Sequence, residues 1–176
     1  MRLMICATGV AAVAASASAQ QFFQASDGVT SFSKAAFADW TDPANQDQIT
    51  PTVAITRQDI EGIFNIVEES SYSFFSSPTG TQWVFGATVQ DVIDGTIGIG
   101  DFASWEDAHG SFPPGTVGVE AVLYLEDDDA YVDIMFTNWG SGGSGGAFAY
   151  DRASIPAPGA LALLGLGGLV AARRRR

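Results

Sequence analysis

The stretch VEAVLYLEDDDAYVDIMFT, residues 119–137, decides the fold of this 176-residue chain. Apolar side chains recur at every second position before and after the acidic run Asp127–Asp129. The alternating positions are Val119, Ala121, Leu123 and Leu125 before the run and Val132, Ile134 and Phe136 after it. Successive side chains of a strand point to opposite faces, so two such runs joined by a short polar turn predict an antiparallel hairpin with one buried face.

Shorter segments on both sides of this hairpin are also typical of strands, and clusters of Gly, Pro, Ser, Asn and Asp separate them. The predicted strands cover residues 29–33, 52–57 paired with 63–68, 82–89, a short piece of 91–100, and 147–153. One helical turn is predicted at the start of residues 105–115, before a proline run ends it. Without a long amphipathic helix, this pattern predicts an all-β fold, an antiparallel β-sandwich of jelly-roll-like type.

Residues 1–20, MRLMICATGVAAVAASASAQ, have the order of a secretory signal peptide. Arg2 precedes an apolar run, and small residues with an A-x-A pattern follow at positions 17–19. We therefore expect an N-terminal signal helix that signal peptidase removes by cutting after Ala19 or Gln20. The apolar run is short for a membrane span.

The last residues, 155–176, contain a proline motif, an apolar run and a basic end, in that order. The motif consists of Pro156, Ala157 and Pro158, and the basic end of Arg173, Arg174, Arg175 and Arg176. As a helix, residues 157–172 would rise about 24 Å, which is short of a bilayer core of about 30 Å. This length suits a transient stop in the inner membrane with the arginines on the cytoplasmic side. An ordinary tail-anchor helix is the alternative.

This tail resembles the PEP-CTERM sorting signal of Gram-negative and related bacteria, with Ala157 in place of the glutamate of the usual Pro-Glu-Pro motif. The resemblance implies that an exosortase, a membrane processing enzyme, recognises the tail and releases or attaches the protein at the outer surface. Residues 21–154 would then form the single working domain, located at the cell surface or outside the cell. This body resembles a recurrent, uncharacterised module of secreted bacterial proteins in residues 31–50, 81–86 and 131–154. That second resemblance implies no particular activity.

Charge is unevenly distributed between the body and the two ends. Twenty acidic residues lie within residues 27–151, whereas Lys34, Arg57 and Arg152 are the only basic residues of the body, which gives it a net charge of −17. Nucleic-acid binding is excluded because phosphate contacts need clustered Lys and Arg, and docking onto an anionic membrane surface is disfavoured. The single cysteine, Cys6, falls in the signal segment, so the body has neither disulfides nor thiolate chemistry.

No catalytic constellation stands out in the body. His109 is the only histidine, and a catalytic triad or a zinc site would need further partners, so we interpret it as a loop residue beside Asp107. No nucleophile-elbow motif occurs, and the sequence selects no pair among its twenty acids for glycoside hydrolysis. We therefore predict a non-enzymatic protein without catalytic residues, cofactor or metal ligands. A secreted hydrolase is the second alternative.

Two features bear on binding. The run Asp127–Asp129 with Glu126 offers oxygen ligands for calcium, but it lacks the spacing of an EF-hand and fits a solvated turn. Four tryptophans offer stacking faces for sugars, although core packing is their more usual role: Trp40, Trp83, Trp105 and Trp139. The sequence thus predicts an exported surface or matrix protein that is structural or adhesive toward extracellular polysaccharide. An extracellular carbohydrate-binding module is the first alternative.

Overall fold

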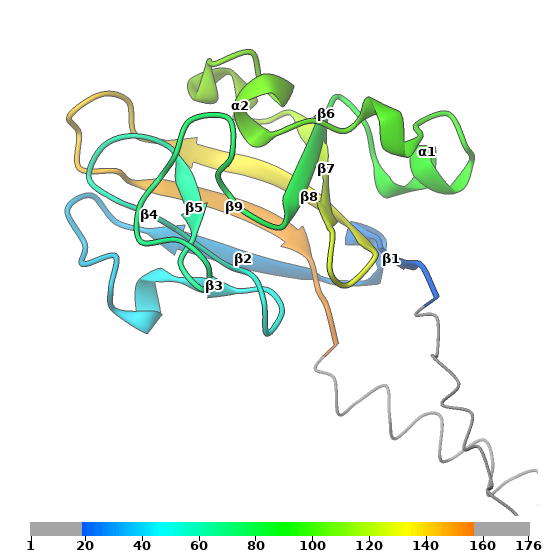
Figure 1. The fold of residues 1–176 in the computed structure, drawn as a ribbon, viewed down its shortest axis with the longest axis horizontal. Coiled ribbons are helices and arrows are strands. Elements are labelled where there is room, and N and C mark those ends of the chain that lie inside the picture. The colour runs from blue at the N-terminus through cyan, green and yellow to red at the C-terminus, as the bar shows by residue number, and fades with distance from the viewer. Residues whose placement is uncertain (1–18, 157–176) are drawn as a thin grey trace, which may run out of the picture.

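A computed structural model describes residues 19–156 of the chain (Figure 1). The predicted signal helix, the apolar helix of the tail and the terminal arginines lie outside the described residues. Within residues 19–156, no helix has the length and apolar character needed to cross a membrane.

Six strands form the larger sheet, in which five follow the order β2-β9-β8-β7-β6 and β1 pairs with β8. Their bounds are Gln21–Phe23 (β1), Val29–Lys34 (β2), Thr81–Phe85 (β6), Glu120–Leu125 (β7), Ala130–Trp139 (β8) and Phe148–Ala153 (β9). Neighbouring strands are antiparallel except β1 and β8, which run parallel. β1 occupies the part of β8 that β9 leaves unpaired, because β9 pairs only with residues 134–139.

The predicted hairpin is confirmed as β7 and β8, next to each other in the larger sheet. Leu123 lies opposite Val132 and Tyr124 opposite Tyr131, with residues 126–129 in the turn. Leu123 and Val132 are fully buried on one face of the sheet. The other face is covered too, since Tyr131 is also buried.

A second sheet of three short strands has the order β3-β4-β5, with bounds Asp47–Gln48, Ala54–Arg57 and Ile63–Asn65. The predicted pairing of residues 52–57 with 63–68 is confirmed as β4 and β5. Ile55 and Ile63 share one hydrophobic core with Leu123 and Val132 of the larger sheet. The protein is therefore mostly β, with two sheets on a common core.

Short helices cover the other face of the larger sheet, where the sequence predicted a strand within residues 91–100. That prediction is wrong, because α1 (Val89–Ile93) and the 3-10 turn η3 (Ile99–Asp101) occupy the region. Asp91 accepts hydrogen bonds from the N–H and the hydroxyl of Thr88, which caps the start of the helix. Val89 packs against the sheet in a second, smaller core with Tyr131.

The remaining short helices lie in connections. α2 (Trp105–Ala108) confirms the predicted helical turn, and η4 (Pro113–Thr116) follows at the proline run. η1 (Ala25–Asp27) joins β1 to β2, and η2 (Pro43–Asn45) precedes β3.

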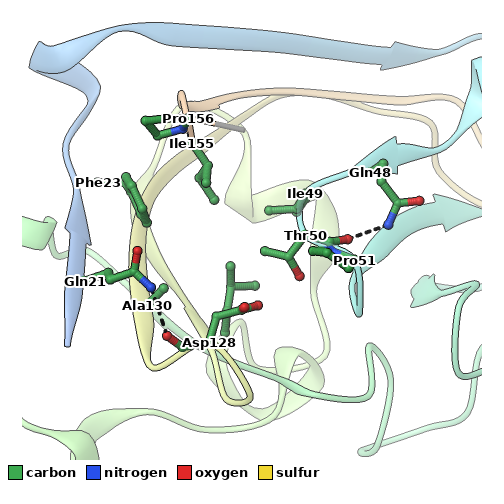
Figure 2. A pocket seen from close by; sticks show the side chains of 11 residues that line it. Gln21, Phe23, Gln48, Ile49, Thr50, Pro51, Asp128, Ala130, Ile155 and Pro156 are labelled. Carbon is green, nitrogen blue, oxygen red and sulfur yellow. Dashed lines mark hydrogen bonds between the residues drawn. The ribbon is translucent and has the colours of Figure 1, made fainter. Parts of the chain in front are cut away.

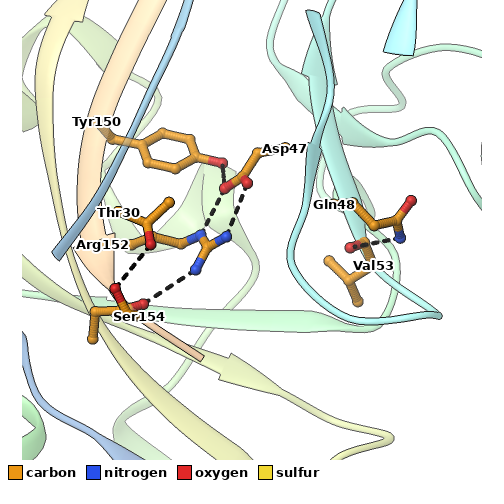
Figure 3. A network of polar contacts seen from close by, with 8 residues as sticks. Thr30, Asp47, Gln48, Val53, Tyr150, Arg152 and Ser154 are labelled. Atoms are coloured by element: carbon orange, nitrogen blue, oxygen red, sulfur yellow. Dashed lines mark hydrogen bonds and ion pairs between the residues drawn. The ribbon is translucent and has the colours of Figure 1, made fainter. Parts of the chain in front are cut away.

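A buried polar contact joins the two sheets (Figure 3). Arg152 of β9 donates to the carboxylate of Asp47 on β3 from Nε at 2.7 Å and from Nη2 at 2.9 Å. The hydroxyl of Tyr150 donates to the same carboxylate at 2.8 Å. All three side chains are buried. A buried ion pair is tolerated when additional hydrogen bonds satisfy its atoms, as the hydroxyl of Tyr150 does here. Because the pair joins a residue of β3 to a residue of β9, it holds these two strands together.

The length of β8 separates two opposite ends of the domain. Gln21 pairs with Ala130 at one end of β8, and the chain leaves β9 toward Pro156 at this same end. Trp139 pairs with Phe148 at the other end of β8. The run from Ala130 to Trp139 spans about 30 Å at strand rise. Both ends of the described chain thus emerge together (Figure 1), and the loops beside Trp139 lie at the opposite end.

Candidate functional site

A pocket of about 480 Å³ opens at the loop end of the domain, beside Trp139. The β4–β5 turn, the loop after β5, the α2–η4 segment and the β8–β9 loop meet around it. We call it the aromatic pocket, because four aromatic side chains line it: Tyr72, Phe74, Trp105 and Trp139. Its charged lining residues are Arg57, Glu61 and Glu106. Binding sites commonly combine such an apolar lining with a few polar groups.

Arg57 is the structural anchor of this pocket. Its Nε donates to the carbonyl of Glu61 at 2.8 Å, and its Nη1 donates to the carbonyls of Gly140 and Ala147 at 2.9 and 3.1 Å. The guanidinium lies over the ring of Trp139, 3.9 Å from its centroid, which is a cation–π contact. Burial lowers the pKa of Arg57 to about 10, so it remains charged at neutral pH.

Glycines allow the loops to close tightly around the pocket. Gly146 has a φ of +62°, and a Cβ there would lie 1.7 Å from the carbonyl oxygen of Gln58. A Cβ at Gly62 would lie 2.5 Å from the ring of Tyr72 and 2.9 Å from the ring of Trp105. Both positions therefore require glycine for the chain to approach its neighbours this closely.

Glu106 provides a buried carboxylate at the pocket, 6% exposed. It accepts a hydrogen bond from the hydroxyl of Tyr72. Burial, followed by the hydrogen bond and the negative charge of Glu106, raises the pKa of Tyr72, so this hydroxyl stays protonated and donates. Ser104 caps the start of the α2 turn that carries Glu106, and its hydroxyl accepts from the N–H of Asp107.

The aromatic side chains form a floor and a rim. Trp105 is fully buried, and its indole N–H has no acceptor among the described residues. Phe74, at 62% exposure, stands at the rim and meets the ring of Tyr72 edge-on, with centroids 5.1 Å apart. Trp139 is half-buried and tilts against Trp105 at 5.2 Å. A flat apolar ligand surface could therefore contact exposed ring faces at this rim.

His109 directly follows α2 and is packed as an aromatic group. Its Nδ1 accepts from the N–H of Phe112 at 3.0 Å, and its ring meets Trp105 edge-on with centroids 4.0 Å apart. Its Nε2 is buried and has no partner among the described residues. Burial lowers its pKa, partly opposed by the charge of Glu106, which favours the neutral ring. In the described part of the chain, no carboxylate or serine hydrogen-bonds to His109 as a triad requires.

The four tryptophans do not form a common platform. Trp83 and Trp105 are fully buried, and Trp40 packs edge-on against Phe64. Only Trp105 and Trp139 line the aromatic pocket. The stacking surface is thus completed by Tyr72 and Phe74, which the sequence did not single out.

The carboxylates of the acidic turn accept hydrogen bonds from different residues and do not share a ligand site. Asp129 has a φ of +47° and accepts from the hydroxyl of Tyr124 at 3.2 Å, while Glu126 accepts from Gln82. Among residues 19–156, no group of three or more His, Cys, Asp or Glu is placed to hold a metal ion. The calcium interpretation of Asp127–Asp129 therefore gains no support.

A second cavity, also of about 480 Å³, lies where the described chain begins and ends (Figure 2). Figure 2 shows Phe23 and Gln21 on one side and Ile49 and Thr50 on the other. The amide of Gln21 donates to a backbone carbonyl at 3.3 Å, which places it in the wall rather than toward a ligand. Pro156, the first residue of the predicted sorting motif, lines this cavity and is exposed.

The structure reaches few of the predicted processing residues. Ala19 and Gln20 are exposed directly before β1, and the amide of Gln20 donates to the hydroxyl of Tyr131 at 3.3 Å. The other motif residues lie outside the described residues: Ala157, Pro158, Arg173, Arg174, Arg175 and Arg176. Comparisons with protein-family models, with curated proteins and with solved structures find no match for this chain.

Sequence reasoning missed four residues of the aromatic pocket: Arg57, Tyr72, Phe74 and Glu106. One signal was present, because Arg57 is one of only three basic residues in a strongly acidic body. Tyr72 and Phe74 lie in a serine-rich loop, and nothing in that loop's sequence indicates which surface it covers.

Proposed function

We propose that this is a non-enzymatic protein of the cell surface or extracellular matrix that binds polysaccharide in the aromatic pocket. The observation that carries the proposal is the lining of one pocket by aromatic rings together with an arginine and two carboxylates. Sugars offer an apolar C–H face to aromatic rings and hydroxyls to charged groups. The pocket also lies about 30 Å along β8 from the terminal end, so a protein held by its tail would present it outward.

A glycan array probed with the full chain tests this proposal. Phe74→Ala removes an exposed ring from the rim, and we expect it to weaken binding roughly 2- to 10-fold. Phe22→Ala is the matched control, because Phe22 stacks on Tyr131 at the opposite end of the sheet and should leave binding unchanged. The absence of glycan binding would contradict the proposal. Release of reducing ends from bound glycans would instead favour a secreted hydrolase.

We also propose that the protein is exported, held transiently in the inner membrane and sorted through residues 155–176. The support is the order of proline motif, apolar run and terminal arginines, combined with the signal peptide. Signal peptidase and an exosortase-type enzyme are the expected partners. Mass spectrometry of surface material should find an N-terminus at Gln20 or Gln21 and no Arg173–Arg176. An intact C-terminus in that material would contradict the sorting proposal.

A jelly-roll-like sandwich is the finer description that we propose for the fold. It is supported by the common core of the two sheets, in which Ile55 packs with Leu123. A crystal structure in which the three-stranded sheet does not pack on the larger sheet would contradict it.

A further inference from the structure

Arg57 and Glu106 bear opposite charges in the same pocket without pairing. Arg57 is 2% exposed and Glu106 is 6% exposed. Among residues 19–156, the only ion pair joins Arg152 to Asp47. Carbonyl oxygens and a ring compensate the charge of Arg57, and a hydroxyl compensates that of Glu106. Both groups also face the open pocket, where a polar ligand can reach them.

Each of the two groups keeps one polar atom that has no partner among the described residues and is open to the pocket. The Nε and Nη1 of Arg57 donate to backbone carbonyls, but its Nη2 donates to no described residue. One carboxylate oxygen of Glu106, Oε2, accepts from Tyr72, while Oε1 accepts from no described residue. The pocket therefore offers one donor and one acceptor of opposite charge.

In its donors and acceptors, a vicinal diol matches this pair, because each hydroxyl both donates and accepts. One hydroxyl would accept from Nη2 of Arg57, and its neighbour would donate to Oε1 of Glu106. Acidic sugars are disfavoured by the charges of Glu61 and Glu106 and by the net charge of the body. A protonated amino group in place of the accepting hydroxyl is disfavoured, because it has only donors and cannot accept from Nη2 of Arg57.

We propose that the aromatic pocket recognises an uncharged pyranose whose adjacent hydroxyls bridge Arg57 and Glu106, with its apolar face against the exposed aromatic rim. This inference rests on the proposed function, since it names the chemical class of the polysaccharide that the same pocket binds.

Titration calorimetry with the full chain in mild detergent tests the bridge. The probes are cellohexaose, mannohexaose, isomaltohexaose and hexagalacturonic acid. We expect a neutral hexaose to bind at least about 10-fold more tightly than the acidic one. Glu106→Gln should weaken that binding about 10- to 100-fold, the range for a hydrogen bond to a charged group. Glu68→Gln changes the same charge outside the pocket and should leave binding unchanged.

The probe itself supplies a measurement that does not depend on a variant's folding. Periodate cleaves the carbon–carbon bond between adjacent ring hydroxyls of the neutral hexaose, and borohydride reduces the resulting aldehydes to primary alcohols. This ring-opened form lacks the vicinal diol and should not bind. The inference is overturned if the oxidised probe binds equally, if the acidic probe binds better, or if a folded Glu106→Gln binds as well as the unaltered chain. The proposed function survives these results when binding still depends on Phe74. If none of the probes binds, the inference is overturned, and the glycan array decides whether the proposed function also fails.

Discussion

Arg57 and Arg152 are both buried guanidinium groups, yet the protein satisfies them differently. Arg152 forms two hydrogen bonds to the carboxylate of Asp47, which also accepts from Tyr150. Arg57 contacts carbonyl oxygens and the ring of Trp139. The first arrangement is closed and structural, whereas the second leaves charge available at a pocket.

Removing one partner of the buried pair should strongly destabilise the fold. Arg152→Met leaves Asp47 buried without its cation, and we expect the free energy of unfolding to fall by about 3–5 kcal/mol. The double variant Asp47→Leu with Arg152→Met should be less destabilised than Arg152→Met alone. Urea unfolding measures both. The control is Asp151→Asn at the half-buried neighbour of Arg152, with a change within about 0.5 kcal/mol. Equal stability of Arg152→Met and the unaltered chain would contradict this account.

His109 should titrate below the ordinary histidine value. Burial lowers its pKa from 6.5, so the unfolded chain binds the proton more readily than the folded one. Stability from this residue is therefore fully present above pH 6.5 and is lost as the pH falls below it. The NMR titration of this only histidine measures the midpoint directly, and His109→Asn should remove its part of the pH dependence. A midpoint above 6.5 would show that the ring is not buried as described.

At the level of elements, the carboxylate of Asp133 on β8 holds two helical segments against the sheet. Its Oδ1 accepts from the N–H of Val89 at the start of α1, at 2.7 Å. Its Oδ2 accepts from the N–H of Ala25 at the start of η1, at 3.0 Å. A helix start leaves backbone donors without partners, so an acceptor on the strand below fixes where α1 forms.

Removing this acceptor should loosen both segments. Asp133→Ala leaves two N–H groups without a protein acceptor, and we expect a loss of about 1–3 kcal/mol in unfolding free energy. Amide hydrogen exchange at Val89 and Ala25 should speed up. Asp133→Asn keeps one accepting oxygen and should have a smaller effect on both measurements. Unchanged exchange at these two amides in Asp133→Ala would contradict the role assigned to the carboxylate.

At the scale of the whole molecule, the described contacts extend slightly beyond the predicted domain 21–154. Gln20 donates to Tyr131, and Ile155 packs against the main hydrophobic core. The folded domain therefore includes Gln20 and Ile155 in addition to residues 21–154.

A fragment of residues 19–156 should fold by itself and unfold in one cooperative transition, since its two sheets share one core. Shortening it to residues 19–154 removes Ile155 and should cost about 1 kcal/mol, because that side chain is only partly buried. Thermal unfolding followed by circular dichroism compares the two fragments. A fragment 19–156 without a cooperative transition would show that folding requires the outer segments.

The sequence was most informative where the pattern of apolar residues depends on a single secondary-structure element. The alternation on both sides of Asp127–Asp129 correctly predicted β7 and β8, because period-2 burial is a local property of a strand. The same kind of pattern gave a wrong prediction within residues 91–100, where hydrogen bonds of Asp91 and Asp133 stabilise a helix instead of a strand. One contact caps the helix and the other comes from a distant strand, and the spacing of apolar residues carries no information about either.

The candidate site was still less predictable. Arg57, Tyr72, Glu106 and Trp139 come from four separate segments, and only the closing of two sheets around a core brings them to one pocket. Their residue types are common in other roles, so no local spacing distinguishes them.

By itself, the sequence determined the strand hairpin, the mostly β composition, the acidic charge of the body and the export signals proposed for its two ends, because each is written in consecutive residues. Only the tertiary structure decided that Asp47 meets Arg152, that Arg57 and Glu106 face one pocket, and that this pocket lies opposite the ends of the described chain. Those relations depend on long-range packing, which sets the positions of residues far apart in the chain.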